Sequence, residues 1–376
     1  MKSSQIPGTS RRDFLARSGA AAAGALYAGS LLAQQTPAGL EGGKKLGFAF
    51  VGIGNLCMHQ LLPGIMTSRF CKPVALVSGH PAKAQEQANK YGINPKNIYN
   101  YENFDSIKDN PEIDVVYVVL PNSMHEEYTI RAAKAGKHVL CEKPMANSAA
   151  ECERMIAACK QANRRLQIGY RLHFEPNTLA CIEAVKKQEV GPLQMIDNGA
   201  GFVIGDPTQW RLKKKMAGGG CMMDIGIYAL NAARYLSGLE PTEVTAMTYA
   251  DRSDPRFKEV EQHCNFQLRF PGGVLANCIS SYNTGLNSFV AHGTKGWCSI
   301  DPGLSYTGVK FHINHGRGAQ TPQLPEIDQF GTEMDAFAQA IVNNTESHAS
   351  GEEGLKDMRI IEAIYRSAES GAAVKL

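Results

Sequence analysis

The chain has 376 residues, of which 43% are hydrophobic and 20% charged, and its formal net charge is +3. This composition is typical of a globular protein, and the length fits two domains at a prior of about 150 residues each. No apolar run reaches the ~20 residues that span a bilayer, and no basic block indicates nucleic-acid binding. Stable membrane insertion and nucleic-acid partners are therefore not expected.

The N-terminus has the pattern of an export signal. Adjacent Arg11 and Arg12 precede residues 19–33, an uncharged stretch rich in Ala, Gly and Leu. Paired arginines before an apolar segment indicate the twin-arginine pathway, which delivers folded proteins to the periplasm. A short amphipathic helix is the alternative, but this stretch has no polar face. We expect a signal peptide at residues 1–33 and an N-terminal arm at residues 34–45.

Residues 34–376 have a formal net charge of zero and contain all ten cysteines. Residues 1–33 contain four lysines or arginines against one aspartate, so their removal takes the formal charge from +3 to zero. No Cys-x-x-Cys pair occurs, and Cys141, Cys278 and Cys298 lie inside apolar runs. We therefore expect mostly buried free thiols and no metal site.

Residues 46–51 form a short apolar run that predicts a buried parallel strand. The turn after it matches Gly-x-Gly-x-x-Gly/Ala, with Cys57 in the third small position. Such a turn lets a pyrophosphate approach the backbone at a helix start, although a chance glycine turn is the alternative. The cofactor contacts expected here are Gly52, Ile53, Gly54, Asn55 and Leu56.

The next predicted strand, residues 74–77, lacks the acid that usually follows it in NAD enzymes. Ser78 stands there instead, and Lys83 comes five residues later. An acid binds the ribose 2′-OH of NAD and would repel a 2′-phosphate, whereas a hydroxyl and a lysine can hold one. We therefore expect NADP rather than NAD, unless Lys83 is only an exposed helix residue.

Two further strand–helix units follow. Residues 115–120 predict a strand, 124–135 a helix, and the next strand ends at Glu142. Alternating strands and helices with short connections predict a parallel sheet, at whose carboxyl edge ligands bind. We expect a Rossmann domain over residues 46–167, with four further side chains on its cofactor side: Asn122, His125, Glu142 and Lys143.

Residues 168–376 predict a second, α+β domain. Alternating segments at 243–250, 264–270 and 274–281 predict antiparallel strands, and helices are expected at 330–343 and 357–370. The fold class is thus α/β, with a Rossmann domain followed by a large, mostly antiparallel open sheet. The apolar face of that sheet needs a cover, so we expect a homo-oligomer, a dimer or tetramer, through it.

Several motifs give the chain a resemblance to a known family, the glucose–fructose oxidoreductase, inositol dehydrogenase and rhizopine-catabolism (Gfo/Idh/MocA) oxidoreductases. The resemblance runs from about residue 47 to the C-terminus and implies the two-domain fold. The motifs are Leu-Pro-Asn-Ser (120–123), Glu-Lys-Pro-Met-Ala (142–146), Gly-Tyr-Arg (169–171), Trp-Arg-Leu (210–212), Gly-Gly-Gly (218–220), Met-Asp-Ile-Gly-Ile-Tyr (223–228) and Gly-Glu-Glu-Gly (351–354).

Three residues of these motifs could assist the oxidation of a sugar. Loss of a hydride from carbon requires a general base for the hydroxyl proton. Asp224 and Tyr228 are four residues apart on a predicted helix at 222–236, and Lys143 could stabilise a tyrosine phenolate. We predict Tyr228 as the base, with Lys143 and Asp224 assisting, although an ordinary helix residue and a first-turn acid are the alternative. Other members of the family have His at the position of Tyr228.

Further contacts with cofactor or sugar are expected around this centre. Trp210 could stack on the nicotinamide ribose or the sugar, and Arg211 could add charge. His173, like His125, is a weaker candidate base. The remaining predicted cofactor contacts are Tyr101, Leu120, Arg171 and Tyr282.

The resemblance implies an NADP-dependent sugar oxidoreductase. It would oxidise an aldose to its lactone and pass the hydride through tightly bound NADP to a second sugar, in a ping-pong cycle. The alternatives are an NAD-dependent glycosidase, a sugar or polyol dehydrogenase without cofactor recycling, and a non-catalytic sugar-binding protein. One feature departs from the exported glucose–fructose branch: the arm at residues 34–45 is short where that branch has a long arm that retains the cofactor.

Overall fold

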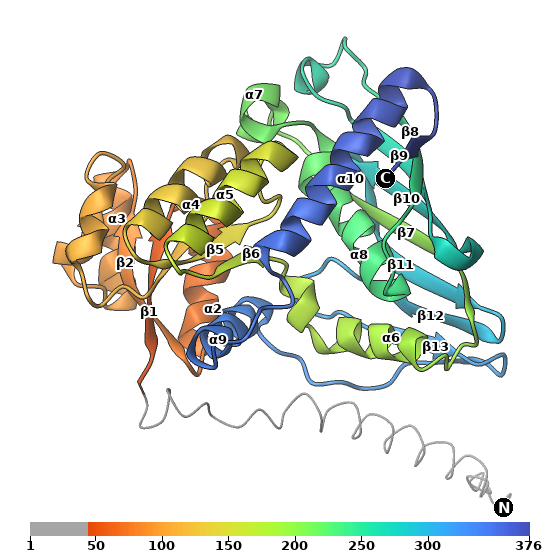
Figure 1. The fold of residues 1–376 in the computed structure, drawn as a ribbon, viewed down its shortest axis with the longest axis horizontal. Helices are drawn as coiled ribbons and strands as arrows, with labels where there is room; N and C mark the ends of the chain where they lie inside the picture. Colours follow the sequence, from red (N-terminus) through yellow and green to blue (C-terminus); the bar gives the residue numbers. More distant parts are fainter. Residues whose placement is uncertain (1–43) are drawn as a thin grey trace, which may run out of the picture.

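The computed structural model describes residues 44–376, which form two domains around two sheets (Figure 1). The predicted signal and most of the predicted arm lie outside the described residues. The first sheet is parallel, with the strand order β3-β2-β1-β4-β5-β6, which is the order of a Rossmann fold. Its strands are β1 (Leu46–Val51), β2 (Cys71–Val77), β3 (Ile98–Tyr99), β4 (Val115–Val118), β5 (His138–Glu142) and β6 (Leu166–Gly169).

The central strand β1 is buried on both faces, as its uninterrupted apolar run requires. Phe48 and Phe50 belong to the core on one face, with residues of α2, α3 and α9. Ala49 and Val51 belong to the core on the other face, with residues of α4 and α5. The bounds are α2 (Leu62–Thr67), α3 (Pro81–Tyr91), α4 (His125–Lys134), α5 (Ala149–Gln161) and α9 (Gln329–Val342).

The second sheet has nine strands in the order β14-β13-β12-β11-β7-β10-β9-β8-β15. Every neighbouring pair is antiparallel except β7 and β10, which confirms the predicted mostly antiparallel sheet. The strands are β7 (Leu193–Val203), β8 (Glu243–Tyr249), β9 (His263–Arg269), β10 (Leu275–Ser281), β11 (Asn283–Gly293), β12 (Gly296–Ile300), β13 (Phe311–Asn314), β14 (Ala319–Gln320) and β15 (Val374–Lys375).

Helices cover one face of this sheet (Figure 1). They are α6 (Pro176–Lys186), α8 (Ile227–Ser237) and α10 (Gly351–Ser370), and the short α7 (Lys214–Ala217) lies near the first domain. On the other face, Met247 is 74% and Ile279 43% exposed, and the strand register places them in one row through Asn265. An exposed apolar patch of this kind is typical of an interface, but the expected homo-oligomer stays a prediction.

The C-terminal part of the chain returns to the first domain. Helix α9 packs on the first sheet beside α2, although strands β7 to β14 of the second sheet precede it in the sequence. The Asp335 carboxylate fixes it there, because it accepts hydrogen bonds from the backbone amides of Arg69 and Phe70, both at 2.9 Å. The predicted boundary at residue 167 therefore separates the two sheets but not all of their helices.

The ten cysteines are all buried and free, as expected from the sequence. Within residues 44–376, no three His, Cys, Asp or Glu side chains gather in a way that could hold a metal ion. No helix in the described part of the chain has both the length and the apolar character to cross a membrane.

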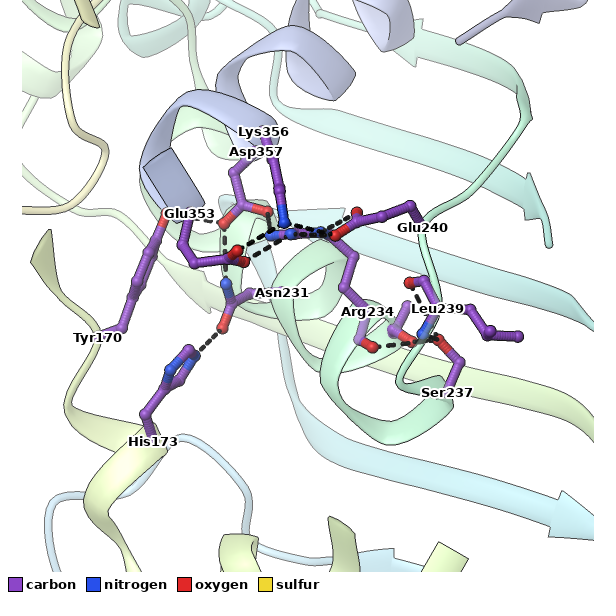
Figure 2. A network of polar contacts seen from close by, with 11 residues as sticks. Tyr170, His173, Asn231, Arg234, Ser237, Leu239, Glu240, Glu353, Lys356 and Asp357 are labelled. Carbon is purple, nitrogen blue, oxygen red and sulfur yellow. Dashed lines mark hydrogen bonds and ion pairs between the residues drawn. The ribbon is translucent and has the colours of Figure 1, made fainter. Parts of the chain in front are cut away.

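A buried network of charges joins α8 to α10 and to the end of β6 (Figure 2). The Arg234 guanidinium donates to Asp357 and Glu353, both at 2.7 Å, and to Glu240 at 2.8 Å. Asp357 also accepts from the Tyr170 hydroxyl at 2.7 Å and from the Asn231 amide at 2.8 Å. Because Asn231 lies three residues after Tyr228, this network anchors the helix that carries the predicted base.

Replacement of Asp357 by Ala should strongly destabilise the fold. Asp357 is completely buried and Arg234 is 4% exposed, so the variant leaves a guanidinium without its innermost partner. Breaking a buried pair in this way costs about 3–5 kcal/mol, and urea unfolding should show a loss of that size.

A matched control is Arg359→Ala, which removes an ion pair to Glu153 between side chains 59% and 54% exposed. Exposed pairs of this kind contribute less than about 1 kcal/mol. Equal losses for the two variants would contradict the assigned importance of the network.

Candidate functional site

A cleft of about 920 Å³ lies at the carboxyl ends of the first sheet's strands and is closed by residues of the second domain. Its size is within the range of ligand sites. The structure brings nearly all predicted site residues to its walls: Gly52, Ile53, Gly54, Asn55, Leu56, Ser78, Lys83, Tyr101, Leu120, Asn122, Glu142, Lys143, Arg171, Trp210, Arg211, Asp224 and Tyr228.

The glycine turn after β1 fits a dinucleotide. Gly52 has φ +95°, and a Cβ there would lie 2.4 Å from the Val119 carbonyl oxygen, so only glycine suits the turn. A Cβ on Gly54 would meet no protein atom within 4 Å, which leaves space on the cleft side. The chain then enters a π-helical turn, Cys57–Leu61, and α2. The open turn at a helix start is suited to a pyrophosphate.

The loop after β2 forms the other wall of this end of the cleft. Ser78 is 4% exposed, and its Oγ accepts a hydrogen bond from the His80 amide at 3.0 Å. Lys83 Nζ reaches the glycine turn and donates to the Ile53 carbonyl at 3.4 Å. The Tyr101 ring lies close to the loop, since a Cβ on Gly79 would be 3.2 Å from its Cε2. This loop contributes no carboxylate to the described walls of the cleft.

Lys143, which directly follows β5, joins the two domains at the catalytic end. Its Nζ donates to the backbone carbonyl of Asp224 at 2.5 Å and lies 3.5 Å from Asp224 Oδ1. It also lies 4.6 Å from the centre of the Tyr228 ring. Burial lowers the pKa of Lys143, but the acidic groups of Tyr228, Asp224 and Glu142 outweigh that effect and raise it above its usual value. The ammonium is therefore a permanent positive charge beside the tyrosine.

Asp224 is held as a carboxylate by three donors. One is Lys143, near Oδ1. The other two are at Oδ2, which lies 3.1 Å from Arg211 Nε and accepts a hydrogen bond from the Tyr282 hydroxyl at 3.0 Å. Burial raises the pKa of Asp224, but Arg211 and Lys143 outweigh burial and lower it below its usual value. A carboxylate so engaged is a poor base, so the geometry fits Asp224 as the group that orients the two cations.

The segment that carries Asp224 differs from the single helix predicted at 222–236. Residues Met222–Gly226 are π-helical, and α8 begins only at Ile227. Tight packing accompanies this turn, because a Cβ on Gly226 would be 2.8 Å from Ser280 Cβ. The wider turn still leaves Asp224 and Tyr228 on the cleft, and π-helical turns are frequent at functional sites.

Glu142 belongs to a buried acidic cluster behind the cleft. The Tyr117 hydroxyl lies 2.8 Å from Glu142 Oε1 and 3.3 Å from Glu333 Oε2. One hydroxyl proton cannot serve two carboxylates, so one of the two carboxyl groups must itself carry a proton. Burial and then the charge of Glu142 raise the pKa of Glu333 well above its usual value. Burial also raises the pKa of Glu142, although the charge of Lys143 opposes that effect. Sequence reasoning missed Tyr117 and Glu333, because Glu333 comes from distant α9.

Two predicted cofactor contacts do not line the cleft. His125 is 1% exposed, and its ring nitrogens lie 2.8 Å from the Leu120 oxygen and 2.9 Å from the Pro144 oxygen. It therefore fixes the ends of β4 and β5 instead of facing a cofactor. Tyr282 is completely buried and acts on Asp224, as described above. The structure therefore places neither side chain on the cleft wall, because position after a strand does not decide which way a side chain points.

His173, a weaker candidate base, does not line the cleft either. Its Nε2 lies 2.8 Å from Asn231 Oδ1 in the network of Figure 2, away from the cleft walls. Burial lowers the pKa of His173 to about 3, so the imidazole stays neutral.

The cleft has further walls that sequence reasoning did not identify. Those from the first domain and α9 include His59, Gln60, His80 and Phe330, and those from the second domain include Phe202, Asp206, Gln209, Leu304 and Tyr306. His80 lies two residues after Ser78 and could have been found from that spacing. Tyr306 and Phe330 could not, because they reach the site only through the tertiary fold.

These features define an enzyme of the oxidoreductase class with a Rossmann domain for NAD or NADP. Residues 46–170 match the family model described as "Oxidoreductase family, NAD-binding Rossmann fold", and residues 178–299 match the GFO/IDH/MocA C-terminal domain. The chain belongs to the Gfo/Idh/MocA family of oxidoreductases.

The alignments with named relatives cover most of this chain and both of its domains. A D-xylose 1-dehydrogenase [NADP(+)] of Haloarcula marismortui is 32% identical over 88% of this chain and 92% of the relative. The inositol 2-dehydrogenase of Rhizobium meliloti is 26% identical over 78% of this chain and 88% of the relative. The crystal structure of an aldose–aldose oxidoreductase from Caulobacter crescentus is 48% identical with a TM-score of 0.87, and covers 89% of this chain and all of the other.

Proposed function

We propose that this protein is an NADP-dependent oxidoreductase that oxidises an aldose to its lactone. The observation that carries the proposal is the contact of Lys143 with both Asp224 and Tyr228 at the catalytic end of a dinucleotide cleft. The named relatives support a sugar substrate, because two of them are called a xylose dehydrogenase and an aldose–aldose oxidoreductase. Two of the three reported relatives are named dehydrogenases and the third an oxidoreductase, so none of these names supports the glycosidase alternative.

In the proposed mechanism, NADP supplies the hydride acceptor, and the protein moves the proton. Tyr228 takes the proton of the anomeric hydroxyl while the hydride leaves the same carbon. The Lys143 ammonium lies 4.6 Å from the centre of its ring and places a positive charge beside the proposed base. Asp224 keeps Lys143 and Arg211 in place without competing for the proton.

We further propose that a second sugar would accept the hydride and be reduced, so that the cofactor would be reoxidised without release of the nucleotide. The 48% identity to an aldose–aldose oxidoreductase supports two sugar substrates in turn. The similarity to a xylose dehydrogenase favours the alternative, a single oxidation with exchange of free NADP. Lactone formation that requires a second sugar, and not added free NADP, would distinguish the first scheme from the second.

Tyr228→Phe should slow the hydride step while leaving the cofactor bound. The variant keeps the ring that packs on Lys143 but loses the proton acceptor, and such general-base catalysis contributes typically ~10²–10⁴-fold. Lys143→Met should cost at least as much, because it removes the cation. The measurement is single-turnover reduction of bound NADP by an aldose, followed at the nicotinamide absorbance.

A suitable control is Tyr91→Phe, at the end of α3 and outside the cleft, which should react at the parent rate. If Tyr228→Phe also reduced its cofactor at the parent rate, Tyr228 would not be the base.

Lys83→Glu should weaken NADP much more than NAD. Lys83 lines the cleft beside Ser78, so we expect its charge to meet the 2′-phosphate, and NAD has none. Loss of a charged hydrogen bond costs about 1.5–3 kcal/mol, so NADP affinity should fall by ~10–100-fold in a nucleotide titration.

Lys90→Glu makes the same charge change near the end of the same helix and does not line the cleft, so it should alter neither affinity. A Lys83→Glu protein that still prefers NADP as strongly as the parent would remove the basis for the predicted specificity.

We also propose that the protein works in the periplasm after folded export. The support is the sequence pattern of residues 1–33, and a recycled bound cofactor suits a compartment where free NADP is scarce. Replacing both Arg11 and Arg12 by Lys should retain the protein in the cytoplasm in cell fractionation. Unchanged export in a strain that lacks the twin-arginine pathway would contradict this.

A further inference from the structure

The loop between β12 and β13 presents an aromatic ring to the catalytic end of the cleft. Tyr306 in this loop lines the cleft and is 44% exposed. Its ring centre is 4.7 Å from the Arg171 guanidinium carbon and 5.4 Å from the centre of the Phe330 ring. The ring is thus supported by protein on one side and open on the other, which is a surface that a ligand can cover.

Two buried side chains, Arg171 and Gln329, hold the backbone of this loop. Arg171 Nη2 donates to the Leu304 carbonyl at 2.5 Å, and Nη1 donates to the Ser305 carbonyl at 3.4 Å and to Gln329 Oε1. Gln329 Nε2 donates to the carbonyls of Ser305 and Tyr306, both at 3.0 Å. We call Arg171 and Gln329, each 3% exposed, the carbonyl clamp.

The clamp also fixes Tyr306 relative to the proposed base. The same guanidinium carbon lies 5.4 Å from the Tyr228 ring centre, so Arg171 contacts both tyrosines. Its Nη groups donate to the loop and to Gln329, so Arg171 spaces the two tyrosines at the wall of the cleft. Burial and then the charge of Tyr228 raise the pKa of Tyr306, so its hydroxyl stays protonated and can both donate and accept.

The position of Tyr306 points to the sugar rather than to the nucleotide's adenosine end. Ser78 follows β2, whereas Lys143 follows β5, three strands along the sheet order. Three strand spacings amount to ~14 Å, so the two ends of the cleft are well separated. Through Arg171 and Tyr228, Tyr306 belongs to the Lys143 end, where the reacting carbon must lie.

We propose that Tyr306 is a specificity-determining residue for the sugar, presented by the carbonyl clamp. Its hydroxyl bonds a sugar hydroxyl other than the one oxidised at Tyr228, and its ring covers an apolar C–H face of the sugar. This inference rests on the proposed function, because it needs a sugar as the substrate.

The test is single-turnover reduction of bound NADP by an aldose and by its monodeoxy analogues. Tyr306→Phe should raise the half-saturating concentration of the parent sugar by ~3–10-fold, the value of a neutral hydrogen bond, with little change in the limiting rate. For the analogue that lacks the contacted hydroxyl, the parent and the variant should have the same half-saturating concentration. The amount of bound NADP should not change.

A second variant tests the clamp without altering Tyr306. Gln329→Leu should raise the half-saturating concentration as Tyr306→Phe does, and the two changes together should add little to either alone, because both act on one contact. Tyr91→Phe, remote from the cleft, is the matched control.

Three results would overturn the inference. Half-saturation at the parent value for every sugar in both Tyr306→Phe and Tyr306→Ala would show that Tyr306 does not bind the sugar. Loss of NADP in these variants would make Tyr306 a cofactor contact. If no aldose reduced the NADP of the parent protein, the proposed function itself would fail, and this inference with it.

Discussion

The ammonium of Lys143 is the interaction on which the rest of the site depends. Lys143 follows the last residue of a strand in the first domain. Its ammonium contacts the backbone carbonyl and the carboxylate of Asp224 and the ring of Tyr228, which all belong to the second domain. A cation at this depth is tolerated only when anionic groups surround it. The same acidic groups raise the pKa of Lys143, so the proposed base lies beside a charged ammonium.

Buried charges elsewhere give that contact its precision. Arg234 and Asp357 fix α8 against α10 and against Tyr170, the residue just before Arg171. Arg171 in turn fixes the loop of Tyr306 and contacts Tyr228. Polar contacts, together with the peptide link from Tyr170 to Arg171, therefore connect the structural network to the cleft. Such an arrangement suits a site that must hold reacting groups within a fraction of an ångström.

The acidic cluster of Glu142, Tyr117 and Glu333 also fixes the position of side chains at the site, by hydrogen bonds to one hydroxyl. Two buried carboxyl groups lie within hydrogen-bond distance of one phenol, and burial raises the pKa of both. Glu142 is the member of the cluster that lines the cleft beside Lys143. The cluster also ties α9, from the end of the chain, to the sheet that binds the dinucleotide, so both domains contribute to the floor of the site.

Sequence patterns alone predicted the features that depend on neighbours in the chain. The apolar run before Gly52, the missing acid after β2 and the spacing of Asp224 and Tyr228 are local, because strands, turns and helix faces repeat over a few residues. They predicted the first sheet and many of the cleft walls, whereas the family came from the resemblance of longer motifs such as Glu-Lys-Pro-Met-Ala (142–146). Side-chain direction was not local: His125 follows a strand end, as expected of a cofactor contact, yet points into the protein.

Contacts between distant segments decided the rest. The π-helical turn under Asp224, the inward position of Tyr282, the placement of α9 on the first sheet and the clamp that presents Tyr306 each join residues far apart in sequence. No periodicity encodes such pairs, because the packing of whole elements brings them together. The sequence thus determined which chemistry the protein carries, and the tertiary structure decided which side chains stand where a substrate can meet them.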